Sequence, residues 1–138
     1  MSIALSVFNA GTTALHQGDF PTAIPLLRQA IRHARASAIA VAAHRNLGIA
    51  LRKTGDQEGA IDAFDRAIAL DPNDVDAMYN RANALAALGR HEDAIDAFQA
   101  VRTRRPEWAQ AANNEGAAWM ALGSAARAEQ CFADAIGL

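Results

Sequence analysis

An internal repeat constrains this chain more than any other feature of its sequence. Four glycines each stand five residues before an alanine that opens an apolar run, and these pairs are Gly18 with Ala23, Gly55 with Ala60, Gly89 with Ala94, and Gly123 with Ala128. Successive glycines are 37, 34 and 34 positions apart. A period of this length predicts stacked helical repeats, which bury a continuous core and leave an extended concave surface. The sequence therefore favours a surface that holds a partner over a cleft that performs chemistry.

Composition and charge narrow the classes of protein. With 138 residues, 51% of them hydrophobic, we expect residues 1–138 to form one domain with a real core. The net charge of -2 gives no general attraction for nucleic acid or membrane. No run approaches the ~18 apolar residues of a membrane helix, and the N-terminus does not resemble a signal peptide. The single cysteine, Cys131, excludes an internal disulfide framework and predicts a reducing, cytoplasmic compartment.

Helix-forming residues dominate, apolar residues recur at helical spacing, and strand signals are absent. We expect helix pairs at 4–17 with 20–35, 38–54 with 57–70, 74–88 with 91–104, and 107–122 with 125–137. The four repeat glycines fall between these helices, where a left-handed cap is needed. Asp19, Asp56 and Ser37 can cap the helices that follow them. Pro25 lies inside an expected helix and predicts a kink or a late start.

With the helix pair and the period established, the chain resembles the tetratricopeptide repeat (TPR) family. The second repeat carries the motif most fully, with Leu47-Gly48, Gly55, Ala60, Phe64, Ala67 and Pro72. The resemblance implies an all-α, right-handed superhelical solenoid of four antiparallel helix pairs, with repeats at about 4–37, 41–74, 75–108 and 109–138. Gly48 and Ala60 are small where helices approach, and Phe64, Phe98 and Phe132 are expected as large knobs between neighbouring pairs.

An asparagine series is the best candidate for a binding site. Each repeat has an asparagine at the equivalent position, and the series is Asn9, Asn46, Asn80 and Asn114. In TPR arrays the first helices line the concave face, so the resemblance implies that the series lies on that face. An asparagine can both donate to and accept from a peptide unit of an extended ligand. The alternative is that these asparagines only support the fold or bind water.

The same face is expected to carry further ligand-binding residues. They are Arg45, Ile49, Arg52, Lys53, Tyr79, Asn83 and Asn113. Arg45, Arg52 and Lys53 make the second repeat locally cationic, which suits a carboxylate on the ligand. The alternative interpretation is a solvated helix face. The set of basic residues that clamps chaperone tails in some TPR domains is incomplete here.

Other residues predict structural roles. Arg81 and Glu115 occupy equivalent places in adjacent repeats and are expected to pair, either in the groove or as a partly buried ion pair. Cys131 is interpreted as a small apolar residue. Arg102 belongs to a basic turn typical of a helix C-terminus. The histidines fall at different positions of the repeat, so we expect no metal site. The sequence has no phosphate-binding loop and no nucleophile elbow, so we expect no cofactor and no catalytic residue.

The leading hypothesis is a non-enzymatic adaptor that binds an extended peptide segment of a partner protein in its concave groove. The alternative is a recognition or assembly module cut from a larger TPR-containing protein, possibly an enzyme. Leu122, Phe132 and Ile136 are expected at or near the outer face of the last pair, so we expect the chain either to self-associate through them or to have been cut from a longer array. RNA binding by a helical repeat is disfavoured by the net charge and the lack of a basic groove.

Overall fold

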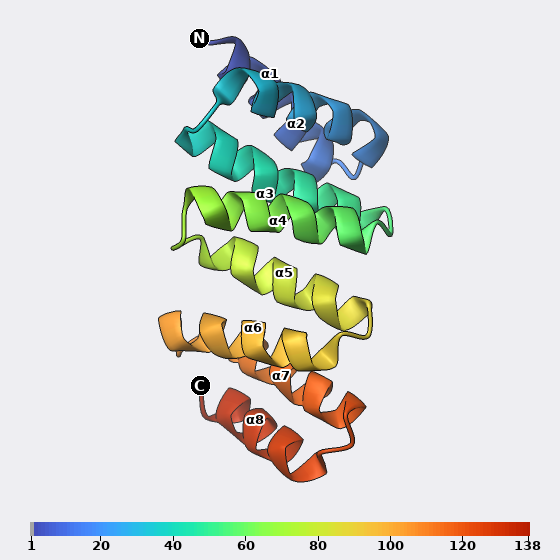
Figure 1. Ribbon diagram of the computed structural model, residues 1–138, viewed down its shortest axis with the longest axis vertical. Coiled ribbons are helices and arrows are strands. Elements are labelled where there is room, and N and C mark those ends of the chain that lie inside the picture. The colour runs from blue at the N-terminus through green and yellow to red at the C-terminus, as the bar shows by residue number, and fades with distance from the viewer. Residues whose placement is uncertain (1) are drawn as a thin grey trace. The chain divides into compact units, whose positions relative to one another are not determined.

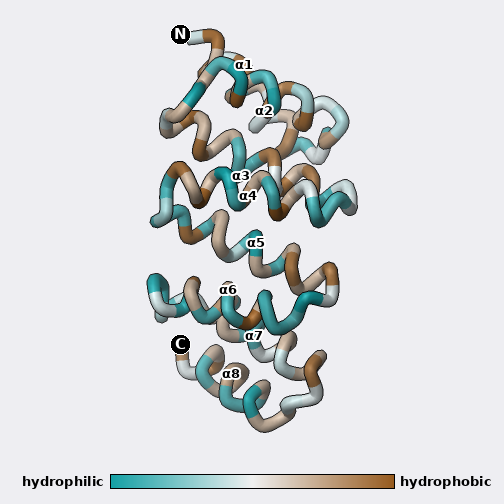
Figure 2. The backbone as a smooth tube through the Cα atoms, viewed as in Figure 1, coloured by the Kyte–Doolittle hydropathy of each residue, from teal (hydrophilic) through white to brown (hydrophobic). Residues whose placement is uncertain are grey.

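The computed structural model describes residues 2–138, which form eight α-helices and no β-strand (Figure 1). The helices are α1 (Ile3–His16), α2 (Phe20–Ala34), α3 (Ala38–Lys53), α4 (Gln57–Leu70), α5 (Val75–Ala87), α6 (His91–Arg104), α7 (Ala109–Ala121) and α8 (Ala125–Gly137). Every expected helix is present, with ends within two residues of the prediction. Hydrophobic and hydrophilic residues follow one another along the helices, as Figure 2 shows. This mixture is typical of helices that bury one face.

The chain divides into two compact units, Met1–Ala77 and Met78–Leu138. In the first unit α1 packs on α2, α2 on α3, and α3 on α4. In the second unit α6 packs on α7, and α7 on α8. The organisation of residues 1–138 as one continuous array stays a prediction.

The repeat glycines end the first helix of each pair as expected. Gly18, Gly55, Gly89 and Gly123 have φ angles of 76°, 93°, 79° and 81°. In this left-handed region a side chain would be strained, and only glycine adopts it without cost. The period read from the sequence is therefore a period of helix caps.

Side-chain caps begin the helices that the sequence marked. Asp19 Oδ1 accepts from the Thr22 amide at 3.3 Å, and Asp56 Oδ1 accepts from the Gly59 amide at 2.9 Å. Ser37 Oγ caps α3 in the same way. Pro25 lies inside α2, and the helix begins at Phe20, so of the two expected effects the late start does not occur and the kink stays a prediction. The Asp19 cap fixes the start of α2 one turn before the proline.

Large rings fill the space inside the helix pairs. Phe64 and Phe98 are fully buried. A Cβ added at Gly48 of α3 would lie 2.5 Å from the Phe64 ring of α4, and one at Gly116 of α7 would lie 2.6 Å from the Phe132 ring of α8. Two of the expected knobs therefore pack across a glycine within their own pair, because only a missing side chain lets a ring lie so close to the facing helix.

The contact across Gly116 also locates Phe132 in the last pair. Phe132 is half-buried, with its ring against Gly116. Leu122 and Ile136 are exposed; Leu122 follows α7, and Ile136 lies in the last turn of α8. Self-association through these three residues stays a prediction.

We predict that Gly48→Ala destabilises the protein by about 1–3 kcal/mol, because the new methyl group overpacks the Phe64 ring. Gly137→Ala is the matched control, since that helical glycine has no atom within 4 Å of an added Cβ. Urea denaturation followed by circular dichroism measures both variants. An unchanged midpoint for Gly48→Ala would contradict the close approach described above.

Candidate functional site

Two asparagines of the predicted series, Asn9 and Asn46, lie in the first unit. Asn46 Nδ2 donates to Thr12 Oγ1 at 3.2 Å and so joins α3 to α1. Ile49, one helical turn later, is half-buried against the hydrophobic core. Asn9 on α1 is exposed. One donor of Asn46 is therefore used inside the protein, in agreement with a partly structural role.

The three basic side chains of α3 that were predicted to bind a ligand differ in how accessible they are. Arg45 Nη1 pairs with Asp74 Oδ2 at 2.8 Å, and the Asp74 side chain is only 4% exposed. Asp74 Oδ1 also accepts from the Ala77 amide at 3.1 Å, which caps the start of α5. Arg52 is half-buried, and Lys53 is exposed. Arg45 thus neutralises a buried carboxylate of its own chain, and Lys53 is the most open cation of the three.

Tyr79, Asn83 and Asn114, three of the predicted site residues, meet in one hydrogen-bond network in the second unit. Asn114 Nδ2 donates to Tyr79 Oη and to Asn83 Oδ1, both at 2.9 Å. Asn114 Oδ1 accepts from Gln110 Nε2 at 2.9 Å. Both amide protons of Asn114 are therefore used within its own chain, and the side chain positions Asn83 and Tyr79 on α5.

Aromatic packing holds Tyr79 from two sides. Its ring lies edge-on to Phe98, with centroids 6.1 Å apart, and against Trp108, with centroids 4.3 Å apart. Arg105 covers the Trp108 ring at 5.4 Å. Trp108 was not expected at the site, because it belongs to no residue series that recurs in the repeats. Tyr79 is consequently a fixed group and not a mobile side chain.

A pocket of about 240 Å³ adjoins this network. It is lined by Asn83, Ala86, His91, Phe98, Asn114, Ala117 and Ala118. The two asparagines supply its polar groups, and Phe98 with the alanines supplies an apolar lining. His91 Nδ1 is buried there and has no hydrogen-bond partner among residues 2–138. The pocket thus combines an apolar floor with amide groups of fixed position.

The two remaining site residues lie on the expected helices. Asn80 lies on α5 and is half-buried, and Asn113 lies on α7 and is exposed. The asparagine series thus places one residue on each of α1, α3, α5 and α7. Its action as a single ladder stays a prediction.

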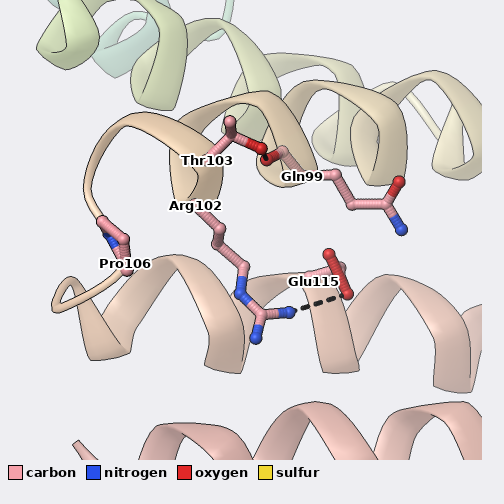
Figure 3. Close-up of a pocket in the computed structure, with 5 residues that line it drawn as sticks. All are labelled: Gln99, Arg102, Thr103, Pro106 and Glu115. Atoms are coloured by element: carbon pink, nitrogen blue, oxygen red, sulfur yellow. Dashed lines mark hydrogen bonds and ion pairs between the residues drawn. The ribbon is translucent and has the colours of Figure 1, made fainter.

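A charged cluster that the sequence analysis missed joins α6, α7 and α8. Arg102 Nη1 lies 3.2 Å from Glu115 Oε2, as the dashed line in Figure 3 shows, and Arg102 Nη2 lies 2.7 Å from Asp134 Oδ2. The Cys131 thiol donates to Glu115 Oε2 at 2.7 Å. Glu115 thus pairs with Arg102, a partner that was not expected, whose guanidinium reaches inward from the end of α6. Cys131 is a polar partner in this cluster and not only a small apolar residue.

The cluster shifts the pKa values of its members. Burial, together with the hydrogen bond and the negative charge of Glu115, raises the pKa of the Cys131 thiol to about 12. The hydrogen bond from Arg102 lowers the pKa of Asp134. Burial alone would lower the pKa of Arg102, but the hydrogen bond with Asp134 and the charge of Glu115 outweigh it and raise that pKa. The cluster therefore keeps the guanidinium charged and the thiol protonated.

Neither a metal-binding cluster nor a membrane-spanning helix is present in the described part of the chain. Residues 2–138 contain no group of histidine, cysteine, aspartate and glutamate side chains that could hold a metal ion. Within the same residues no helix is both long and apolar enough to cross a bilayer.

Comparison with known families decides the assignment. The tetratricopeptide repeat pattern matches residues 8–75, 62–107 and 79–138. The chain belongs to the tetratricopeptide repeat family. Proteins of the TPR family are generally non-enzymatic interaction modules, so the chain is assigned to protein interaction. A search of curated proteins found none that matches the sequence.

Solved TPR structures share the fold. A crystal structure of MamA is 27% identical, with a TM-score of 0.92 over 98% of this chain and 77% of that chain. A tetratricopeptide repeat protein from Parabacteroides merdae is 24% identical, with a TM-score of 0.86 over 95% of this chain and 51% of that one. YrrB, described as a TPR protein with an unusual peptide-binding site, is 24% identical, with a TM-score of 0.87 over 98% of this chain and 68% of that one.

We predict that Cys131 in the folded protein reacts with a disulfide reagent at pH 8 at least 100-fold more slowly than in urea, because a thiol of pKa about 12 is almost wholly protonated there. Glu115→Gln removes the negative charge beside the sulfur and should speed the reaction. Asp134→Asn is the control, because it leaves the contact between Glu115 and Cys131 in place. A folded protein that reacts at the unfolded rate would disprove the protected thiol.

Proposed function

We propose that this TPR chain binds an extended peptide segment of a partner protein through the surface that α5 and α7 share in its second unit. The observation that carries the proposal is the network of Tyr79, Asn83 and Asn114 beside the pocket of about 240 Å³. Groups of fixed position favour binding because less conformational entropy is lost when the ligand arrives. The family supports protein interaction in general, and this surface is where the polar and apolar requirements of a peptide coincide.

The chemistry of the pocket suits one residue of a peptide and its backbone. Because Asn83 Oδ1 already accepts from Asn114, the Asn83 side chain offers its amide protons, which match a peptide carbonyl. Ala86 and Ala117, which line the pocket and are not buried, offer an apolar surface for a side chain of the ligand. Each net hydrogen bond contributes about 0.5–1.5 kcal/mol and each buried aliphatic side chain about 1.5–3 kcal/mol. A few such contacts give weak, reversible binding in the millimolar to micromolar range.

The first unit adds a separate surface on α3. Asn46, Ile49, Arg52 and Lys53 retain the polar, apolar and cationic character expected of a peptide contact. Arg45 is excluded from direct ligand binding in this proposal because Asp74 occupies its Nη1. Lys53 and Arg52 then favour acidic residues in the part of the peptide that contacts this unit.

Selection from a displayed peptide library, followed by calorimetric titration of the selected peptides, tests the proposal. We expect Asn83→Ala to weaken binding by about 2- to 10-fold, which is the value of one hydrogen bond. Asn114→Ala should also weaken binding, because Asn83 and Tyr79 lose the side chain that positions them. Asn46→Ala reports on the first unit in the same way. The free energy of unfolding of each variant, measured in urea, separates lost binding from lost folding.

Gln99→Ala is the matched control, because it removes an amide side chain that lines a different pocket of the same unit. Peptides that bind the wild type and all three asparagine variants with equal affinity would show that the asparagines are structural.

A further inference from the structure

A second pocket lies in the first unit, on the side of α3 that packs between α2 and α4. Its volume is about 350 Å³. We name it the α2–α4 pocket, and its lining residues are Arg28, Ile31, Arg32, His44, Leu47, Leu51, Gly59, Asp62, Ala63 and Arg66. None of them belongs to the predicted asparagine series, so the pocket is a separate feature of the chain.

The floor of the α2–α4 pocket is apolar. Leu47 and Leu51 of α3 and Ala63 of α4 belong to the hydrophobic core but reach the pocket, and Ile31 of α2 is only partly buried. A side chain placed on this floor would remove apolar surface of both partners from water, which is worth about 25 cal/mol per Å² in transfer terms. The floor therefore suits an aliphatic side chain.

The rim of the pocket carries excess positive charge. Arg28 and Arg32 stand one helical turn apart on α2, both are exposed, and neither has an ion pair within residues 2–138. Arg66 pairs with Asp62 at 3.2 Å on the opposite wall. Three arginines and one aspartate leave two positive charges without a partner, in a chain whose net charge is -2.

His44 adds an unsatisfied polar atom between floor and rim. Its Nδ1 is buried and has no hydrogen-bond partner among the described residues. Burial and the positive charge of Arg66 lower the pKa of His44, against the smaller raising effect of Asp62. The ring is therefore neutral at pH 7 and adds no positive charge to the pocket.

The equivalent pocket of the second unit shows a version in which the charges are neutralised by the chain itself. There Arg102, Glu115 and Cys131 stand at the repeat positions of Ile31, Leu47 and Ala63. This pocket, of about 340 Å³, is drawn in Figure 3, where Arg102 and Glu115 face each other. Its charges are neutralised by residues of its own chain, whereas the lining of the α2–α4 pocket has only one carboxylate, Asp62, for three arginines.

We propose that the α2–α4 pocket binds an acidic segment of a partner protein in which an aliphatic residue adjoins a carboxylate side chain. The aliphatic group covers the floor formed by Ile31, Leu47 and Leu51, and the carboxylate accepts from Arg28 and Arg32. Arginines four positions apart on a helix lie about 5–6 Å from each other, so both can reach one carboxylate or two neighbouring ones. The inference rests on the proposed function only in that the occupant is a peptide, and it concerns a different face of the chain.

Titration of the isotope-labelled full chain with acetyl-Gly-Leu-Glu-Glu-Leu-Gly-amide, followed by NMR, tests the proposal. We expect chemical shifts to change at His44 and at the Nε–H groups of Arg28 and Arg32. Three probes serve as comparisons: the same peptide with both glutamates changed to glutamine, the same peptide with both leucines changed to glycine, and inorganic phosphate. Each should bind at least 5-fold more weakly than the parent peptide.

The double variant Arg28→Gln/Arg32→Gln should bind the parent peptide at least 10-fold more weakly than the wild type. Arg104→Gln/Arg105→Gln removes the same charge from an exposed site on α6 and its following turn, and should bind within 2-fold of the wild type. Equal binding by the two double variants, or equal binding of the glutamine peptide, would overturn the carboxylate site. Phosphate binding as tight as that of the peptide would overturn the apolar part of the proposal.

Asn83→Ala distinguishes this inference from the peptide surface of α5 and α7. Its affinity for the acidic peptide should equal that of the wild type, since Asn83 belongs to the second unit. A loss of binding in Asn83→Ala, together with unchanged binding in Arg28→Gln/Arg32→Gln, would assign the peptide to the surface of α5 and α7 and reject the α2–α4 pocket as its site.

Discussion

The close approach of two helices across a glycine is the contact on which the rest of this structure depends. At Gly48 the facing ring of Phe64 occupies the space where a side chain would otherwise stand, and Gly116 faces Phe132 in the same way. These contacts fix the distance between the helices of a pair, because a ring and a missing side chain fit together at one separation only. The position of every surface residue on α3 and α7 follows from that separation.

Packing of this kind uses few positions in each repeat and leaves the others free to differ. The pocket between successive pairs illustrates the freedom. In the first unit it is apolar at its floor and positive at its rim, while in the second unit Arg102, Glu115 and Asp134 neutralise one another. One scaffold therefore produces a neutralised structural cluster in one place and an unfilled cationic pocket in another. The difference arises from side-chain chemistry and not from the course of the backbone.

The sequence predicted the scaffold well because its signals are local. Glycines with positive φ and the caps at Asp19 and Asp56 act within a few residues of themselves, so pattern alone locates them. Partners across the fold were harder to predict. Two ion pairs illustrate this: Glu115 pairs with Arg102, and Asp74 pairs with Arg45. Whether such residues meet depends on the rotation of each helix about its axis and on the rotamer of a long side chain. For the same reason, the sequence identified Tyr79, Asn83 and Asn114 as members of one face but not as members of one network.

The buried sulfur of Cys131 has a consequence for where such a chain can work. A lone cysteine in a sequence suggests a reducing compartment, on the assumption that its thiol is available for oxidation. Here the thiol is 5% exposed, and Glu115 and burial together raise its pKa to about 12. Because the thiolate is the nucleophile that attacks oxidants and other disulfides, a thiol with this pKa reacts with them slowly. Cross-linking of neighbouring chains through Cys131 is therefore slow as long as the helices around the sulfur stay folded.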